Sequence, residues 1–140
     1  MRRITILGEP FGKQRHRAGK GFSYTPAKTV NYENLVQLIY QEAYAGQKML
    51  EGPMAIRIDA WFGIPKSTSK KKKALMLEGK IRPTKRPDID NIEKIIADAL
   101  EGLAYANDSC IVKAQVEKWY AEIPRVEVRL VELEVELEEV

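Results

Sequence analysis

The sequence is poor in the residues that hold many small domains together or bind soft metals. It has one cysteine, Cys110, and one histidine, His16, among 140 residues. A single cysteine excludes a disulfide within the chain, and this pair supplies too few ligands for a zinc cluster. Any metal bound here would therefore have to be a hard cation held by oxygen atoms.

Long hydrophobic runs are also missing. No stretch approaches the roughly 20 consecutive apolar residues that cross a bilayer. The basic start at residues 1–3 is followed by an apolar stretch too short for a signal peptide, with no small-residue cleavage site. Apolar residues make up 44% of the chain and charged residues 31%, which is typical of a folded soluble protein. We expect a single domain over residues 1–140, located in the cytoplasm, with no membrane partner.

The hydrophobic pattern predicts four strands and three helices in the order β-α-β-α-α-β-β. Alternation predicts the strands and a helical spacing of apolar residues predicts the helices. The clearest helix has Ile92, Ile95, Ile96, Ala99, Leu100 and Leu103 on one face. In the last strand the apolar parity changes, which predicts a bulge near Leu130. The expected fold is a mixed four-stranded sheet with helices packed on it, of the α/β (α+β) class.

The net charge of +3 hides a strong asymmetry along the chain. Residues 66–86 contain nine basic residues and one acid, residues 1–20 contain six basic residues and Glu9, and residues 117–140 contain eight glutamates. Two basic blocks indicate a surface for a polyanion, although a lysine run is as often plain solvated surface. The DNA-binding candidates are Lys13, Arg15, Arg17, Lys20, Lys70, Lys71, Lys72, Lys73, Lys80, Arg82, Lys85 and Arg86.

The basic loop at residues 12–24 also contains aromatic side chains. Phe22 and Tyr24 stand among glycines and basic residues. Such side chains stack on bases or sugars in proteins that bind single strands. They also serve to attach a loop to a core, so the loop favours nucleic acid without requiring it.

The acids that suggest chemistry stand at the start of the clearest helix. Asp88 and Asp90 follow a basic segment, and Asp108 lies in the turn after the helix. If the chain path brings Asp108 back, the three carboxylates suit Mg²⁺, with Mn²⁺ as an alternative. A bound cation would polarise a phosphodiester and activate water. Lys94 shares a helix face with Asp90 and would stabilise developing negative charge.

A purely structural interpretation of the same residues is about equally good. Asp90 and Glu93 have the spacing of a capping box at a helix start. Asn107-Asp108-Ser109 is a good turn without any metal. Asp88 is the acid that this interpretation explains least, because Asp90 already fills the cap.

The run from Arg86 to Leu100 (RPDIDNIEKIIADAL), followed by Asn107-Asp108 before a strand, resembles the RusA-type Holliday junction resolvases. The resemblance is specific over residues 85–116. It implies a small homodimeric, magnesium-dependent endonuclease that nicks symmetrically related strands of a four-way DNA junction in recombination and repair. It also implies that Asp88, Asp90 and Asp108 are the metal-binding catalytic acids and that Lys94 is a catalytic lysine.

Two other functions are compatible with the sequence. The first is a basic nucleic-acid-binding module without activity, in which the acids only cap and turn the chain. The second is a nuclease that acts on flaps or other branched DNA. The dimer interface would use either the C-terminal strand or the helix at residues 27–46.

Overall fold

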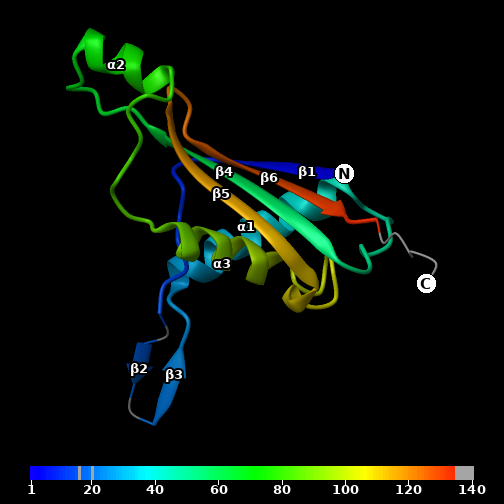
Figure 1. Ribbon diagram of the computed structural model, residues 1–140. Coiled ribbons are helices and arrows are strands. Elements are labelled where there is room, and N and C mark those ends of the chain that lie inside the picture. Colours follow the sequence, from blue (N-terminus) through cyan, green and yellow to red (C-terminus); the bar gives the residue numbers. More distant parts are fainter. Residues whose placement is uncertain (16, 20, 135–140) are drawn as a thin grey trace.

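The computed structural model describes residues 1–15, 17–19 and 21–134. A four-stranded mixed sheet with three helices confirms the expected fold class. Figure 1 shows α1 and α3 covering one face of the sheet and α2 projecting at one end. The sheet strands are β1 (Arg2–Leu7), β4 (Met54–Gly63), β5 (Ile111–Ala121) and β6 (Arg125–Glu132), and the helices are α1 (Ala27–Ala43), α2 (Lys70–Leu77) and α3 (Ile89–Leu100).

The strand order in the sheet is β1-β6-β4-β5. β6 runs antiparallel to both β1 and β4, whereas β4 and β5 are parallel. A parallel pair needs a long crossover between its strands, and α2 and α3 lie on that crossover. The crossover therefore places α3 on the sheet and ends in a turn that leads straight into β5.

The core lies between the sheet and the two covering helices. Alternate residues of β4 are buried because only one face of the strand meets the helices. The apolar stripe of α3 is buried as its spacing predicts, and each such side chain contributes roughly 1.5–3 kcal/mol. The opposite, polar face of α3 is thereby turned toward solvent. The buried residues of these two elements include Met54, Ile56, Ile58, Ala60, Phe62, Ile92, Ile95, Ile96, Ala99 and Leu100.

The basic loop contains more regular structure than its sequence predicts. β2 (Arg17–Gly19) and β3 (Phe22–Tyr24) pair as a small antiparallel hairpin, which forms a sheet of its own. Figure 1 shows this hairpin extending away from the body of the molecule. We call residues 12–25 the arm.

Ser69 caps α2 and accepts a hydrogen bond of 3.3 Å from the amide of Lys72. The expectation of a bulge near Leu130 was wrong. β6 pairs in unbroken register through Leu130 and ends at Glu132, so residues 125–132 contain no bulge. The change in apolar parity marks the end of the strand instead, and residues 135–137 of the expected strand lie outside the described residues.

Within the described residues, no helix combines the length and the apolar character that crossing a bilayer requires.

Candidate functional site

The segment that leads into α3 is held against β5. The guanidinium carbon of Arg82 lies 3.4 Å from the centre of the Trp119 ring, and its Nε donates a hydrogen bond to the Lys118 carbonyl. Trp119 is fixed in turn, because its Nε1 donates a 3.0 Å hydrogen bond to the buried carboxylate of Asp59. These contacts set the path of the backbone just before α3.

Asp88 occupies the N-cap position of α3, so the helix begins two residues earlier than the capping box predicts. The Asp88 carbonyl accepts the amide hydrogen of Ile92 at 3.0 Å, but its side chain makes no capping hydrogen bond. Asp90 therefore lies in the first helical turn rather than at the cap. Both carboxylates are exposed at the N-terminal end of the helix.

Asp90, Lys94 and Asp98 follow one another at intervals of four residues. That spacing places them on one face of α3, opposite the buried stripe. Lys94 is exposed, and Asp98 is half-buried. The face thus presents one ammonium group between two carboxylates.

The turn after α3 brings Asp108 back to this face. The amide of Asp108 donates a 3.1 Å hydrogen bond to the carboxylate of Glu101. The buried Tyr105 ring lies beneath the turn, and its hydroxyl donates a 2.7 Å hydrogen bond to the Ala97 carbonyl. Burial raises the pKa of Tyr105, and the neighbouring carboxylates raise it further, so the phenol stays a proton donor. The chain path therefore brings Asp108 beside Asp98 and Glu101 and into a hollow shared with Asp90, but not to Asp88.

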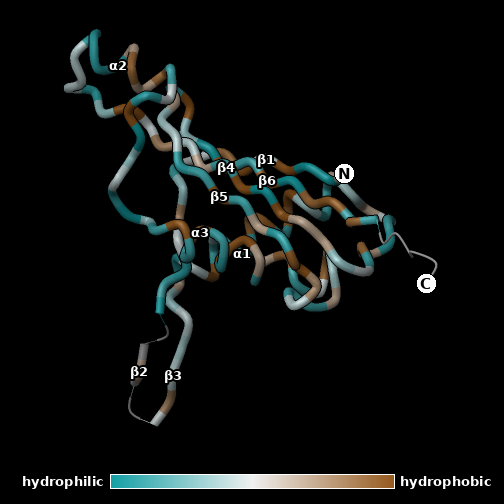
Figure 2. The backbone as a smooth tube through the Cα atoms, in the orientation of Figure 1, coloured by the Kyte–Doolittle hydropathy of each residue, from teal (hydrophilic) through white to brown (hydrophobic). Residues whose placement is uncertain are grey.

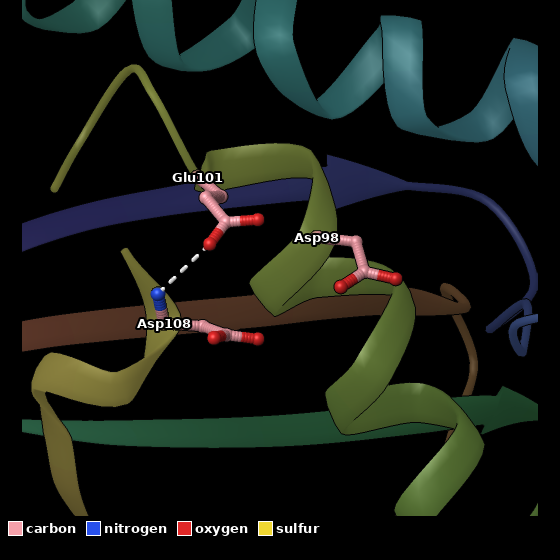
Figure 3. A group of neighbouring side chains, drawn as sticks. All are labelled: Asp98, Glu101 and Asp108. Atoms are coloured by element: carbon pink, nitrogen blue, oxygen red, sulfur yellow. Dashed lines mark hydrogen bonds between the residues drawn. The ribbon is translucent and has the colours of Figure 1, made fainter. Parts of the chain in front are cut away.

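Asp98, Glu101 and Asp108 form an acidic cluster at the C-terminal end of α3. One carboxylate oxygen from each lies within 4.8 Å of the others, and Figure 3 shows the three side chains gathered there. Beside them is a hollow of about 300 Å³ that Asp90 and Asp108 share. Its walls are Asp90, Glu93, Lys94, Ala97, Asp98 and Asp108.

Asp88 is not brought into that hollow. It lines a separate, larger pocket of about 790 Å³ on the other side of the first turn of α3. The exposed side chains of Arg15 and Arg86 line the same pocket. The structure thus gathers two of the three predicted acids, Asp90 and Asp108, and sets Asp88 beside two cations at the helix start.

The acids around α3 differ in how they are already engaged. Asp98 forms an ion pair with Lys13 at 3.1 Å, and Glu101 accepts the backbone hydrogen bond described above. Among the described residues, the side chains of Asp88, Asp90 and Asp108 have no hydrogen-bond or ion-pair partner. Glu93 and Lys94 share this property. The three predicted acids therefore have no side-chain partner among the described residues, whereas Asp98 and Glu101 are already engaged.

The donor set fits a hard divalent cation. Mg²⁺ takes six oxygens at about 2.1 Å, so its ligand atoms lie roughly 3–4 Å from one another. The carboxylate oxygens of Asp98, Glu101 and Asp108 lie within 4.8 Å of one another, and Asp90 adds a further carboxylate to the adjoining hollow. The site also borders solvent, which leaves room for water and for a substrate phosphate. The residues present therefore suit Mg²⁺ or Mn²⁺ rather than a soft metal.

Lys13 has a structural position that its sequence context did not predict. Its ammonium lies between the carboxylates of Glu33 on α1 and Asp98 on α3, and its side chain is 14% exposed. Burial opposes the charged form, but the hydrogen bonds and charges of the two acids outweigh burial and raise the pKa of Lys13. Lys13 thus ties the root of the arm to both helices.

The other basic candidates divide into engaged and open groups. Lys73 pairs with Glu122 at 3.0 Å, Lys80 pairs with Glu78 at 3.1 Å, and Arg82 stacks on Trp119. The ammonium of Lys85 lies 5.8 Å from the centre of the Phe62 ring. Arg17 belongs to β2, but the structure does not describe its side chain. Lys20 lies outside the described residues. The open group, exposed and without a partner among the described residues, is Arg15, Lys70, Lys71, Lys72 and Arg86.

The sequence reasoning missed Lys118 as a residue of the site. Lys118 lies on the helix-facing side of β5, and its Nζ donates a hydrogen bond to the Lys85 carbonyl. Burial lowers the pKa of Lys118, the charge of Asp88 opposes that shift, and Lys85 adds to it. The signal was present in the sequence, since a lysine stands in the otherwise apolar row Val112, Ala114, Val116 and Tyr120.

Replacing Lys70, Lys71 and Lys72 together by glutamine should flatten the salt dependence of DNA binding. Each phosphate contact contributes about −0.9 to the slope of log K against log salt, so the slope should fall by about 1 for each lysine that touches DNA. Fluorescence anisotropy at several salt concentrations measures it. Lys73→Gln is the matched control, because Glu122 already balances that charge. An unchanged slope in the triple variant would make this run plain surface.

Two comparisons with known proteins find similarity over nearly the whole chain, and one of them identifies a family. The family model described as endodeoxyribonuclease RusA matches residues 8–131, which is nearly the whole chain. The chain is also 36% identical over 137 residues to the uncharacterized protein YqaN of Bacillus subtilis (strain 168). That match covers 94% of this chain and 96% of YqaN.

Proposed function

Since the chain belongs to the RusA family of endodeoxyribonucleases, we propose that it cuts four-way DNA junctions by metal-dependent hydrolysis of phosphodiesters. The observation that carries this proposal is the set of side chains left without partners around α3. Asp88, Asp90, Asp108 and Lys94 are exposed and unpaired among the described residues, and cationic side chains stand beside them. A structural role as caps or salt bridges would have engaged them.

In this proposal Asp90 and Asp108 would hold Mg²⁺ from the hollow that they share, and Asp88, which lines the neighbouring pocket at the helix start, would add a third carboxylate on the side where the DNA strand enters. When bound, the cation supplies Lewis-acid polarisation of the scissile phosphate and activation of a water nucleophile. The carboxylates balance the charge of the cation, which the helix dipole at this end mildly opposes. Arg15 and Arg86 bind phosphate beside Asp88 and orient the strand for in-line attack.

Lys94 acts on the charge that develops during cleavage. Its ammonium lies on the face of α3 between Asp90 and Asp98, where it reaches the same hollow as Asp108. A cation at this position stabilises negative charge on the phosphoryl oxygens or on the leaving oxygen.

Lys94→Ala should therefore lower the nicking rate about 10²–10³-fold with little change in DNA affinity, because removal of one such group costs that much in other enzymes. Single-turnover cleavage and metal-free binding separate the two effects. Lys80→Ala, at an exposed lysine paired with Glu78, is the matched control. A loss of affinity with the cleavage rate intact would make Lys94 a phosphate contact only.

We also propose a two-fold homodimer, which would present two equivalent sites to the symmetric strands of a junction. Of the two interfaces that the sequence suggested, β6 has neighbours on both sides in the sheet. α1 instead carries the exposed apolar side chains Val30, Leu35 and Leu38. These features favour α1 as the interface.

One comparison of substrates tests the function. Purified protein should nick a synthetic four-way junction in Mg²⁺ at symmetric positions, and nick flap and linear duplex DNA of the same sequence far more slowly. Chelation of the metal should abolish nicking and preserve binding. Preference for the flap would make it a nuclease for other branched DNA. Binding without cleavage at any Mg²⁺ or Mn²⁺ concentration would make it a non-enzymatic module.

A further inference from the structure

The arm starts at the proposed active site. The amide of Lys13 donates a 2.9 Å hydrogen bond to the Asn91 carbonyl in the first turn of α3. Gly12 lies so close to this turn that a Cβ there would be 2.6 Å from the Cβ of Pro87. The root of the arm is therefore packed directly on the residues that flank Asp88, and whatever the arm binds lies next to that site.

The far part of the arm carries two aromatic side chains in water. Phe22 is 61% exposed and Tyr24 is 46% exposed, with ring centres 6.0 Å apart and planes inclined at 40°. Phe22 lies across Gly19, where a Cβ would be 2.4 Å from the ring. Figure 2 shows the arm as hydrophilic to neutral, with a hydrophobic spot where β3 begins. Exposing aromatic surface is unfavourable, so a pair held out on a projecting hairpin indicates a ligand.

The charge around the pair identifies the kind of ligand. Lys13 is already paired with Glu33 and Asp98, but residues 14–26 also contain Arg15, Arg17 and Lys20 and no aspartate or glutamate. Aromatic rings among cationic side chains bind nucleic acid by stacking on base faces while the cations track the phosphates. In an intact duplex each base face is covered by its neighbours, so this pair needs DNA whose stacking is interrupted.

We propose that Phe22 and Tyr24 stack on the nucleobases exposed at the branch point of the DNA substrate. This inference rests on the proposed function, whose substrate is branched DNA, and it adds the feature by which the protein distinguishes a branch from a duplex. The chain between Lys13 and Gly19, which pairs with Phe22, spans at most about 20 Å. The stacking site is therefore within about 20 Å of the root of the arm, which packs beside Asp88.

The double variant Phe22→Ala/Tyr24→Ala tests this directly. Its affinity for a four-way junction should fall about 10-fold or more, because stacking on even one base is worth that much. Its affinity for a linear duplex of the same length should change less than about 3-fold. Both are measured by anisotropy in EDTA, where no cleavage occurs. 2-Aminopurine at the branch point should change its fluorescence with the wild type and not with the double variant.

Three controls make the result specific. Phe22→Tyr/Tyr24→Phe keeps both rings and should keep junction affinity and the 2-aminopurine response. Ile123→Ala removes an equally exposed apolar side chain from the β5–β6 turn and should change neither. Circular dichroism and the duplex affinity show that each variant is folded.

The outcomes separate this inference from the proposed function. Equal losses on junction and duplex, or no loss on the junction, would overturn the stacking role even if the protein nicks junctions normally. A selective loss on the junction in a protein that cuts no substrate would support the stacking role and overturn the nuclease.

Discussion

Asp90→Asn should slow metal-dependent nicking of a four-way junction by about 10³-fold or more. Loss of a carboxylate ligand removes several kcal/mol of transition-state stabilisation, and each 1.36 kcal/mol is tenfold in rate. Junction binding should be intact or tighter, because a negative charge beside the phosphate has been removed. Asp88→Asn and Asp108→Asn should slow nicking by a similar factor and should likewise retain junction binding. Cleavage and metal-free binding are measured on the same junction.

The neighbouring acids provide matched controls for this result. Asp98→Asn and Glu93→Gln remove charge from the same hollow without removing a proposed ligand, so each should lower the rate about 10-fold or less. Rates as low in Asp98→Asn and Glu101→Gln as in Asp108→Asn would place the cation in the tight cluster of these three acids. Full activity in both Asp88→Asn and Asp90→Asn would contradict the proposed ligands.

Tyr105→Ala should lower the free energy of unfolding by about 3–5 kcal/mol, the usual cost of removing a large buried aromatic side chain. The ring is fully buried, and its hydroxyl joins the turn after α3 to the Ala97 carbonyl. Urea denaturation measures the change through the midpoint at constant slope. A variant within about 1 kcal/mol of the wild type would show that the ring does not hold this part of the core.

Tyr105→Phe separates the hydrogen bond from the packing. It keeps the ring and removes the hydroxyl's hydrogen bond to the Ala97 carbonyl, which still accepts the amide of Glu101, so the cost should be about 0.5–1.5 kcal/mol. Because the same turn presents Asp108, the alanine variant should also lose nicking activity at temperatures where it is still folded. If the phenylalanine variant loses as much stability as the alanine variant, the hydrogen bond rather than the ring dominates.

The fold was predictable wherever the apolar period was strong. α3 buries Ile92, Ile95, Ile96, Ala99 and Leu100 on one stripe, and the inward row of β4 alternates along the whole strand, so local pattern and burial agree. The hairpin in the arm was not predictable in this way. Its strands have three residues each and bury no face against the body, so no apolar period marks them.

The site was predictable where its residues share one element. The four-residue spacing of Asp90 and Lys94 on a helix fixes their common face from sequence alone. The position of Asp108 depends on a turn, a hydrogen bond to Glu101 and the packing of Tyr105, which are set by tertiary structure. The ion pairs of Lys13 likewise depend on two helices far apart in sequence, so its charge looked free for DNA.

The order of strands in the sheet bears on how the protein is made. Among the described residues β6 is the last strand in sequence, yet it lies between β1 and β4, and within that part of the chain β1 pairs with β6 alone. On the ribosome β1 therefore emerges first and stays unpaired until residues 125–132 have been translated. Such long-range pairing is slow, and open strand edges favour aggregation in the meantime. A nascent chain halted shortly before Arg125 would carry every helix and every proposed catalytic acid, but its sheet would lack an interior strand.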